Sequence, residues 1–323
     1  MTPLLLLQLP HVVTREIINQ FELGERFILS LCSKRSQKFV RMNQSKTSKW
    51  NMCLTCEDSV LSIGVGRENV DQIVKLRRLR ILLNKNQNLE RILIGDRAGL
   101  FLQTRDACEV GVGSVEKSDF RFLVDYLCDI FDTRPTVIHT YPGHLWLINM
   151  YRNPMDLIHI HSTDHPLTRD EIRTTFHSCQ INELQLDAEI DRGSQSIYFG
   201  LVKKIDIRNW RWTTVENFMN IAESCQEIYA NTPWLIDEFI KHWMKGNMTK
   251  FRFMIIDFTV FNWNLARIFK DLEQDQIYVA QRMECVIDGR VYVIKPGTKA
   301  VRRRDGRVLG VDLTDHSLVV TVV

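Results

Sequence analysis

The first forty residues carry apolar positions at helical spacing, separated by short polar stretches. The apolar positions fall into three groups: Val13, Ile17 and Phe21; Phe27, Leu29 and Leu31; and Phe39 with Val40. The first group recurs at every fourth position, which predicts one face of a helix. Pro10 should stop that helix from extending backwards, because proline disfavours a helical conformation in the residue before it. Three short helices bury little surface alone, so we expect the rest of the chain or a partner to cover them.

From residue 50 onward the pattern changes to short apolar runs of strand length. We predict strands at residues 51–55, 60–65, 77–83 and 89–94. Residues 84–88 predict a turn between the last two strands. Antiparallel pairing is the expected arrangement, although residues 70–82 also fit a helix. Residues 105–117, rich in Gly and acids, predict a loop, and residues 120–131 predict an amphipathic helix.

From residue 155 short apolar stretches recur at intervals of 21 to 27 residues. They lie at residues 157–160, 184–186, 205–207, 228–229 and 253–256. Helix patterns lie between them. Thr168 with Glu171 is a capping sequence for one helix, and Thr213 or Thr214 caps another. Intervals of ~20–29 residues are typical of leucine-rich repeats, whose units bury their faces only against their neighbours. A layered α/β domain with parallel strands would give a similar pattern.

The C-terminal part predicts antiparallel strands. Asp288-Gly289 and Asp305-Gly306 are hairpin turn signals flanked by alternating apolar residues, and residues 318–323 predict a last strand. The whole chain therefore predicts an α+β fold. Three N-terminal helices precede a mixed strand and helix region, a repetitive strand–helix α/β domain and a C-terminal antiparallel hairpin region. We expect boundaries that give segments 1–43, 44–150 and 151–323.

The composition is that of an ordinary soluble globular protein. The chain has 323 residues, of which 45% are hydrophobic and 25% charged, and its net charge is +3. The charge is uneven, because residues 1–50 hold eight Lys or Arg against three acids. The eight cysteines are scattered, and neither a secretory signal nor a membrane-spanning run is evident. We therefore expect a cytoplasmic or nuclear protein with reduced thiols.

The N-terminal segment resembles an F-box. The residues that carry the resemblance are Leu9, Pro10, Val13, Ile17, Leu29, Leu31, Cys32, Lys34, Arg35 and Val40. The closing run from Leu29 to Ser36 is similar to the form found in the large nematode-expanded F-box families. The resemblance implies that all of these residues except Val40 bind the Skp-type linker subunit of a cullin-based SCF ubiquitin ligase. Glu22-Leu23-Gly24 stands where the family often has an Asp-Pro cap before its second helix.

Two stretches near the C-terminus resemble the type 2 F-box-associated domain. In the first, Phe239, Trp243 and Gly246-Asn247 precede an apolar strand. The second is Arg302-Arg303-Arg304-Asp305-Gly306, which is similar to the strand and turn near the end of that family. Both stretches follow the N-terminal segment in the family's order. The resemblance implies that residues 151–323 form a substrate-recognition domain.

Histidine and cysteine patterns elsewhere favour structural roles over a metal site. Cys53 and Cys56 have the spacing of half a zinc site, but no second pair follows, so we expect half-buried cysteines. His159 and His161 lie on alternate positions of one predicted strand, without a carboxylate motif of a known metal type. We therefore predict no metal and no cofactor.

Basic and aromatic clusters favour structure as well. Arg302 to Arg304 could contact phosphates, but no aromatic platform accompanies them, and exposed charges are common at hairpin edges. Most tryptophans should lie in the core. Trp210 and Trp212 are the candidates for an exposed rim that binds a target protein. No Gly-x-Ser-x-Gly, P-loop or dinucleotide motif is present.

The sequence therefore predicts a non-catalytic adaptor. Its N-terminal helices should bind the Skp-type linker subunit and through it a cullin, and its C-terminal domain should bind an unknown protein to be ubiquitinated. No partnership with nucleic acid or membrane is expected. A ligase-independent interaction scaffold with a vestigial F-box is the alternative. A hydrolase within residues 45–150 is a third hypothesis.

Overall fold

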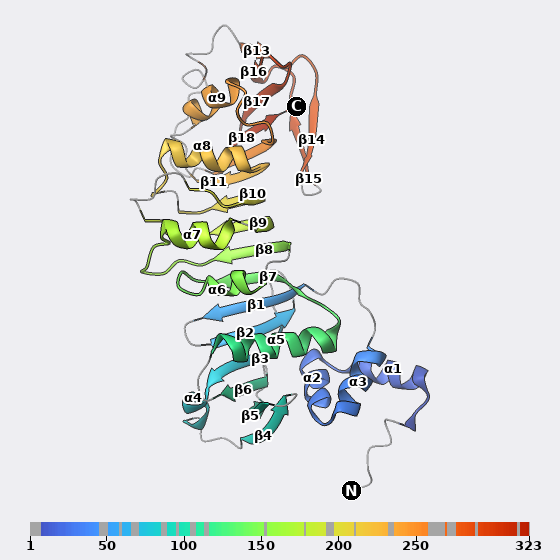
Figure 1. The fold of residues 1–323 in the computed structure, drawn as a ribbon. Coiled ribbons are helices and arrows are strands. Elements are labelled where there is room, and N and C mark those ends of the chain that lie inside the picture. The colour runs from blue at the N-terminus through green and yellow to red at the C-terminus, as the bar shows by residue number, and fades with distance from the viewer. Residues whose placement is uncertain are drawn as a thin grey trace. The chain divides into compact units, whose positions relative to one another are not determined.

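The computed structural model divides the chain into two compact units, Met1–Thr140 and Tyr141–Val323. The residues that the structure describes are 8–44, 51–57, 60–65, 71–84, 89–94, 97–103, 108–112, 116–151, 154–177, 179–191, 197–209, 211–231, 236–257, 269, 276–287, 290–314 and 317–322. Both units combine helices with strands, as the predicted α+β class requires (Figure 1).

The three predicted N-terminal helices are present. They are α1 (His11–Gln20), α2 (Leu23–Leu31) and α3 (Lys34–Asn43). Pro10 immediately precedes α1. The Glu25 carboxylate accepts a hydrogen bond from the Glu22 N–H at 2.9 Å, which satisfies the start of α2 without an Asp-Pro cap. The Ser33 hydroxyl accepts a hydrogen bond from the Ser36 N–H at 3.0 Å and so caps α3.

The rest of the first unit is built around a mixed sheet. Its strands are β1 (Met52–Glu57), β2 (Val60–Val65), β3 (Asp71–Arg78), β4 (Glu90–Ile94), β5 (Arg97–Gln103), β6 (Cys108–Val112) and β7 (Pro135–Thr140). Their order across the sheet is β7-β1-β2-β3-β6-β5-β4. The β1–β7 and β3–β6 pairs are parallel and the other neighbours are antiparallel. The predicted strands near residues 51–55, 60–65 and 89–94 are confirmed.

Two predictions for this region are wrong. The strand covers Asp71–Arg78 and only Leu79–Leu83 form a short helix, α4, so neither a strand at 77–83 nor a helix at 70–82 is correct. The predicted loop contains strand β6. Its acid, Glu109, is buried and lies 3.2 Å from the Arg77 guanidinium of β3. An acid paired inside the fold therefore looked in the sequence like a loop residue.

Helix α5 (Lys117–Phe131) connects the N-terminal helices to the rest of the first unit, because it packs against α2 and α3. It confirms the predicted amphipathic helix, and Figure 1 shows it beside α2 and α3. The ring of Tyr126 in α5 stands edge-on to Phe27 in α2, with 6.3 Å between the ring centroids. The Tyr126 hydroxyl lies 3.2 Å from the Ser30 carbonyl oxygen, to which it donates a hydrogen bond. Helices α2 and α3 therefore pack on α5, and α2 also packs on strand β3 of the sheet.

Five strands of the second unit run parallel in chain order. They are β8 (Met155–Ile160), β9 (Gln180–Leu186), β10 (Leu201–Ile207), β11 (Glu227–Ala230) and β12 (Phe253–Asp257). Each contains one of the predicted apolar stretches. One wholly buried residue from each strand stands in register with the next: Ile158, Leu184, Ile205, Ile228 and Met254. This row is the centre of the unit's core.

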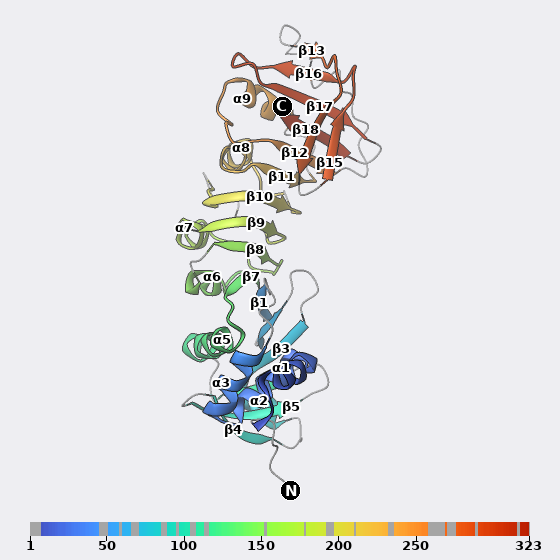
Figure 2. The ribbon, with the colours of Figure 1, turned by 90° about the vertical axis from the view of Figure 1, so that its right-hand side faces the viewer.

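Helices cover one side of these parallel strands (Figures 1 and 2). They are α7 (Arg169–Phe176), α8 (Val215–Ser224) and α9 (Ile236–Met244), and the short α6 (Trp146–Met150) precedes β8. The Thr168 and Thr214 hydroxyls accept hydrogen bonds from the N–H groups of Glu171 and Asn217, as the capping sequences predict. Among the described residues no helix lies between β9 and β10. The successive strand–helix repeats therefore differ from one another. The assignment to leucine-rich repeats remains a prediction.

Antiparallel strands follow β12, which confirms the predicted antiparallel pairing of the C-terminal part, while the turn predicted at Asp288-Gly289 lies outside the described residues. The strands are β13 (Gln276–Tyr278), β14 (Met283–Ile287), β15 (Arg290–Ile294), β16 (Lys299–Arg302), β17 (Val308–Leu313) and β18 (Ser317–Val322). Strands β18, β17, β16 and β13 continue the sheet in that order, and β14 pairs with β15 in a separate hairpin. Gly306, in the turn between β16 and β17, has a φ of 90°, which favours glycine.

Candidate functional site

The nine residues predicted to bind the linker subunit all keep accessible surface in the first unit. Leu9, Pro10, Val13, Cys32, Lys34 and Arg35 are exposed, and Ile17, Leu29 and Leu31 are half-buried. We call these nine residues the docking face. Apolar surface that a chain does not cover for itself is available to a partner.

The opposite sides of the three helices face the protein's own core. Ile18 in α1, Phe27 in α2 and Val40 in α3 are wholly buried. The apolar stripe predicted for α1 is therefore its outward side, since Val13 is 44% exposed while Thr14 is buried. The helical spacing of apolar residues alone does not distinguish a stripe that packs against the protein's own core from one that is exposed to a partner.

Two strongly exposed apolar residues of this segment were not predicted as site residues. Val12 in α1 is 71% exposed and Met42 in α3 is 61% exposed. Leu9, Val12 and Val13 lie within about one helical turn, so their side chains can contribute to one surface. The four-residue spacing of apolar positions predicted Val13 as a binding residue but not the adjacent Val12. The pair of adjacent valines at the start of the helix is the sequence feature that could have indicated both.

Polar contacts between helices orient the docking face on the first unit. The Asp129 carboxylate of α5 accepts hydrogen bonds from Arg41 and, at 3.2 Å, from Gln37 of α3. The Arg26 guanidinium of α2 donates from Nε to the Phe21 carbonyl oxygen at 2.9 Å, and burial lowers the Arg26 pKa. The Arg41–Asp129 pair is half-exposed, so it contributes more to alignment than to stability.

The docking face carries positive charge at the start of α3. Lys34 and Arg35 are exposed in the first turn, and Lys38 follows one turn later. Cations are unfavourable at a helix N-terminus because the helix dipole is positive there. Helix stability therefore does not explain these residues. A partner with an acidic surface would be attracted and oriented by them.

Cys53 and Cys56 are buried on β1 rather than half-buried as predicted. Their spacing of three places the two side chains on opposite faces of the strand. Burial raises the pKa of the Cys53 thiol to about 12. The thiolate that would bind a metal or act as a nucleophile is therefore strongly disfavoured.

His159 and His161 lie side by side at the end of β8, with 3.9 Å between the ring centroids. His159 Nε2 lies 2.8 Å from a carboxylate oxygen of Asp187, and Arg208 approaches the other oxygen at 3.6 Å. Burial raises the pKa of Asp187, but the contacts with His159 and Arg208 outweigh it, so the pKa is lowered overall. The sequence did not predict this contact, because Asp187 follows β9 whereas His159 lies on β8.

The prediction that Trp212 lies on an exposed rim is wrong, because its side chain is only 5% exposed, and Trp210 lies outside the described residues.

Arg303, predicted as a solvated hairpin charge, is buried, at 4% exposure. Its guanidinium lies 4.7 Å from the Trp243 ring centroid and donates to the Trp243 carbonyl oxygen at 3.2 Å. The hydrogen bond from Arg303 lowers the pKa of Asp305 to about 2.

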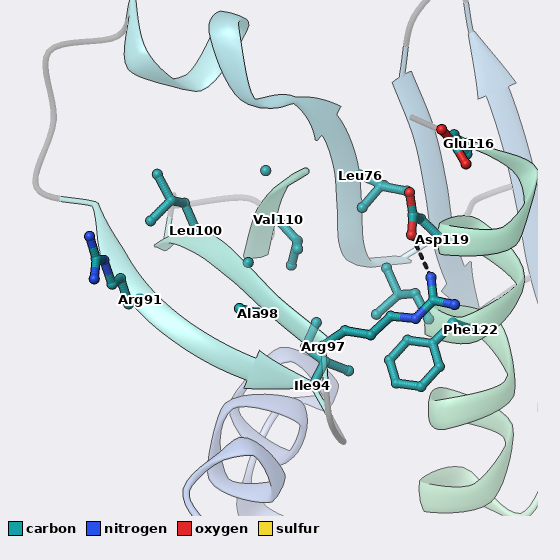
Figure 3. A pocket seen from close by; sticks show the side chains of 13 residues that line it. Leu76, Arg91, Ile94, Arg97, Ala98, Leu100, Val110, Glu116, Asp119 and Phe122 are labelled. Carbon is teal, nitrogen blue, oxygen red and sulfur yellow. Dashed lines mark hydrogen bonds and ion pairs between the residues drawn. The ribbon is translucent and has the colours of Figure 1, made fainter. Parts of the chain in front are cut away.

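A hollow of 680 Å³ lies in the first unit between α5 and strands β3 to β6 (Figure 3). Its wall includes Leu76 and Val110. Arg97 reaches across its mouth to pair with Asp119, and its guanidinium lies 4.8 Å from the Phe122 ring centroid. The acids of the described lining are Glu116 and Asp119, and the Asp119 carboxylate is paired with Arg97. The hydrolase hypothesis for residues 45–150 remains a prediction.

The comparison with known proteins concerns the N-terminal helices. Residues 6–48 match the F-box domain family, so the chain carries an F-box domain there. No curated protein and no solved structure matches the chain. Across the described residues, the helices are too short or too polar to cross a membrane.

Proposed function

Because residues 6–48 carry an F-box domain, we propose that this protein is a substrate-recognition adaptor of an SCF-type cullin ubiquitin ligase. The docking face binds the Skp-type linker subunit and through it a cullin. The second unit binds the protein to be ubiquitinated. The chain itself forms and breaks no covalent bond, and it acts in the cytoplasm or the nucleus.

The observation that carries this proposal is the division of the three helices into two sides. Ile18, Phe27 and Val40 are wholly buried in the first unit, whereas none of the nine docking-face residues is buried. Burying one leucine or valine side chain at an interface contributes roughly 1.5–3 kcal/mol. Several such residues, with exposed cations beside them, therefore contribute binding energy towards an acidic partner.

Tethering is the proposed mechanism. The adaptor holds its target next to the ubiquitin-loaded enzyme, so the target lysine meets that enzyme at a high effective concentration. A rigid adaptor serves this purpose better than a flexible one, because the geometry of approach is fixed in advance. The contacts of Phe27 and Ser30 with Tyr126 favour such rigidity between the docking face and the first unit.

We assign the second unit to the type 2 F-box-associated domain of nematode-type F-box proteins. The two stretches that resemble this domain meet in space, because Arg303 of the second lies against Trp243 of the first. A buried arginine needs all of its partners to offset the cost of removing its charge from water. This mutual dependence supports the view that both stretches belong to one domain signature.

The test is recovery of the Skp-type linker with the full-length chain. We compare the wild-type protein with Val13→Glu, which places a carboxylate in the docking face. Leu93→Glu is the matched control, because Leu93 is 61% exposed on β4 of the same unit. Burying an unpaired carboxylate at an interface is costly, so we expect Val13→Glu to reduce linker recovery by about tenfold or more and Leu93→Glu to leave it unchanged.

No recovery of the linker with the wild-type protein would contradict the adaptor hypothesis, and equal recovery with all three proteins would contradict the assigned docking face. Linker binding without cullin recruitment would favour the scaffold with a vestigial F-box. Deletion of residues 1–43 is a poor substitute for the point variant, because it also removes Phe27 from its contact with Tyr126 in α5.

A further inference from the structure

A small hollow lies on the second unit between α7 and the segment that leads into β10. It has a volume of 210 Å³ and is lined by Arg169, Ile172, Arg173, His177, Ile197 and Tyr198. The floor is apolar, since Ile172 and Ile197 are both buried. Sites for whole cofactors or drug-sized molecules occupy roughly 300–1,000 Å³, so this hollow suits a single side chain.

The wall opposite α7 is held in place by the fold. Gly200 has a φ of +74°, and a Cβ there would clash with the Phe176 carbonyl oxygen at the end of α7. The rings of Phe176 and Phe199 meet edge-on with 5.4 Å between centroids. The Ile197 N–H donates to the Asn217 side-chain oxygen at 3.3 Å. The hollow is therefore preformed, which lowers the entropic cost of filling it.

Three basic side chains surround the opening. Arg169, Arg173 and His177 follow one another every four residues along α7 and its C-terminal cap, which places them on one side of the helix. Asp170 lies 3.2 Å from Arg173, but the two side chains are 83% and 72% exposed, and such a pair is worth little. Glu171 is engaged in capping the start of α7. The opening therefore favours an anion.

Tyr198 in the lining, and two residues of the elements that follow the hollow in the chain, carry exposed apolar surface. Tyr198 is 46% exposed, Leu201 is 50% exposed and Val215 is 41% exposed. The Leu201 N–H donates to the Cys179 carbonyl oxygen, just beyond the C-terminal cap of α7. Val215 is the first residue of α8, and the first turn of that helix is hydrogen-bonded to the wall. Tyrosine and arginine, together with tryptophan, are enriched where binding energy concentrates.

From this combination we propose that the hollow recognises an acidic peptide segment of the target protein. One aliphatic side chain of the peptide enters the hollow, and a neighbouring anionic group pairs with Arg169 or Arg173. The inference rests on the proposed function, because it states the chemistry of the target. A guanidinium binds carboxylate and phosphate oxygens in the same forked geometry. Glutamate and phosphoserine therefore supply the same chemistry from two sources.

A nucleic acid fits this region less well. Single strands are bound by a basic groove that follows the backbone and by successive aromatic platforms for the bases. Among the described residues of the lining, Tyr198 is the one Phe, Tyr or Trp, and the floor is apolar. Its dimensions and its floor match an aliphatic side chain rather than a stacked base.

The test uses the full chain and a phage-displayed library of random peptides. The library is selected on the wild-type protein, on an Arg169→Glu, Arg173→Glu double variant and on a Lys245→Glu, Lys250→Glu control. All four side chains are exposed on the second unit, so both double variants change the charge equally without disturbing the core. Synthetic copies of an enriched peptide with Glu, phosphoserine or Gln at the acidic position then separate the two sources of the anion.

We expect the wild-type protein and the lysine control to enrich peptides with an acid beside an aliphatic residue. Such a peptide should bind the arginine double variant about tenfold more weakly or worse, since a charged hydrogen bond is lost and a repulsion gained. Enriched peptides without acids, equal affinity for the arginine variant, displacement of the peptides by a single-stranded oligonucleotide, or no enrichment would each overturn the proposal.

The linker measurement keeps this inference separate from the proposed function. The arginine double variant should retain full linker binding, because its substitutions lie in the second unit and the docking face in the first. Failure of the wild-type chain to bind the linker would refute the adaptor role, whereas the peptide selection would still decide whether the hollow binds acidic segments.

Discussion

Truncating Phe27 to alanine should destabilise the whole first unit and not the F-box helices alone. Phe27 is wholly buried, and its ring meets Tyr126 of α5 edge-on at 6.3 Å. Phe→Ala at such a site costs about 3–5 kcal/mol, part of which is the aromatic pair at about 0.5–1.5 kcal/mol. A domain is typically stable by about 5–15 kcal/mol. The variant should therefore remain mostly folded but open far more often.

Hydrogen exchange measured by mass spectrometry can follow this effect element by element. Exchange through global opening depends on the free energy of unfolding. A loss of about 3 kcal/mol should speed exchange on the order of a hundredfold in the slowest amides of α5 and β3. The control is Val12→Ala, because Val12 is 71% exposed and its truncation should leave exchange unchanged.

Unchanged protection of α5 and β3 in the Phe27→Ala protein would refute this reasoning. In that case only residues 8–44 would exchange faster, and the three helices would be an independent bundle. The packing of Phe27 and Ser30 against Tyr126 would then contribute little to the stability of the sheet.

Three further predictions concern single residues. Gly200→Ala should destabilise the second unit by about 1–3 kcal/mol, because its φ of +74° and the nearby Phe176 carbonyl oxygen exclude a side chain; an unchanged thermal midpoint would contradict this. Exposed Cys32 should react with iodoacetamide long before buried Cys53, whose pKa is raised to about 12; equal labelling by mass spectrometry would count against it. Asp305 has a pKa lowered from 3.8 to about 2, so its stabilising effect should be complete above pH 4 and lost as the pH falls towards 2; Asp305→Asn should flatten that part of the stability profile.

The helices and most strands were predictable because local pattern determines them. Pro10 and the spacing of apolar residues located α1, and the Thr168–Glu171 sequence located α7. Both signals act within a few residues of the chain, so tertiary contacts did not override them. The five parallel strands were found for the same reason, since each is a short apolar run.

Buried charges were the features that the sequence concealed. Glu109 lies inside the first unit beside Arg77, and Arg303 lies inside the second against Trp243. Their partners, Arg77 and Trp243, are distant in the sequence. An interpretation of the local sequence alone therefore predicts that both charges are solvated. This is why β6 was predicted as a loop and Arg303 as an exposed hairpin charge.

The docking face was identified by its residue types, but its orientation was not. The sequence indicated an apolar stripe through Val13 and Ile17, and a stripe of this kind normally faces its own core. In the folded first unit Ile18 takes that role and Val13 remains exposed. Only the packing of α1 against α3, and of α2 and α3 against α5, distinguishes the two outcomes.

The most direct test of the account is a calorimetric titration of the purified Skp-type linker subunit into the full-length protein. Leu31 is half-buried on the docking face, so Leu31→Ala should remove a large fraction of roughly 1.5–3 kcal/mol. We predict a measurable 1:1 complex with the wild-type chain and a Kd about tenfold weaker for Leu31→Ala. No binding by the wild-type chain, or the same Kd for both proteins, would contradict the claim that these helices dock the linker.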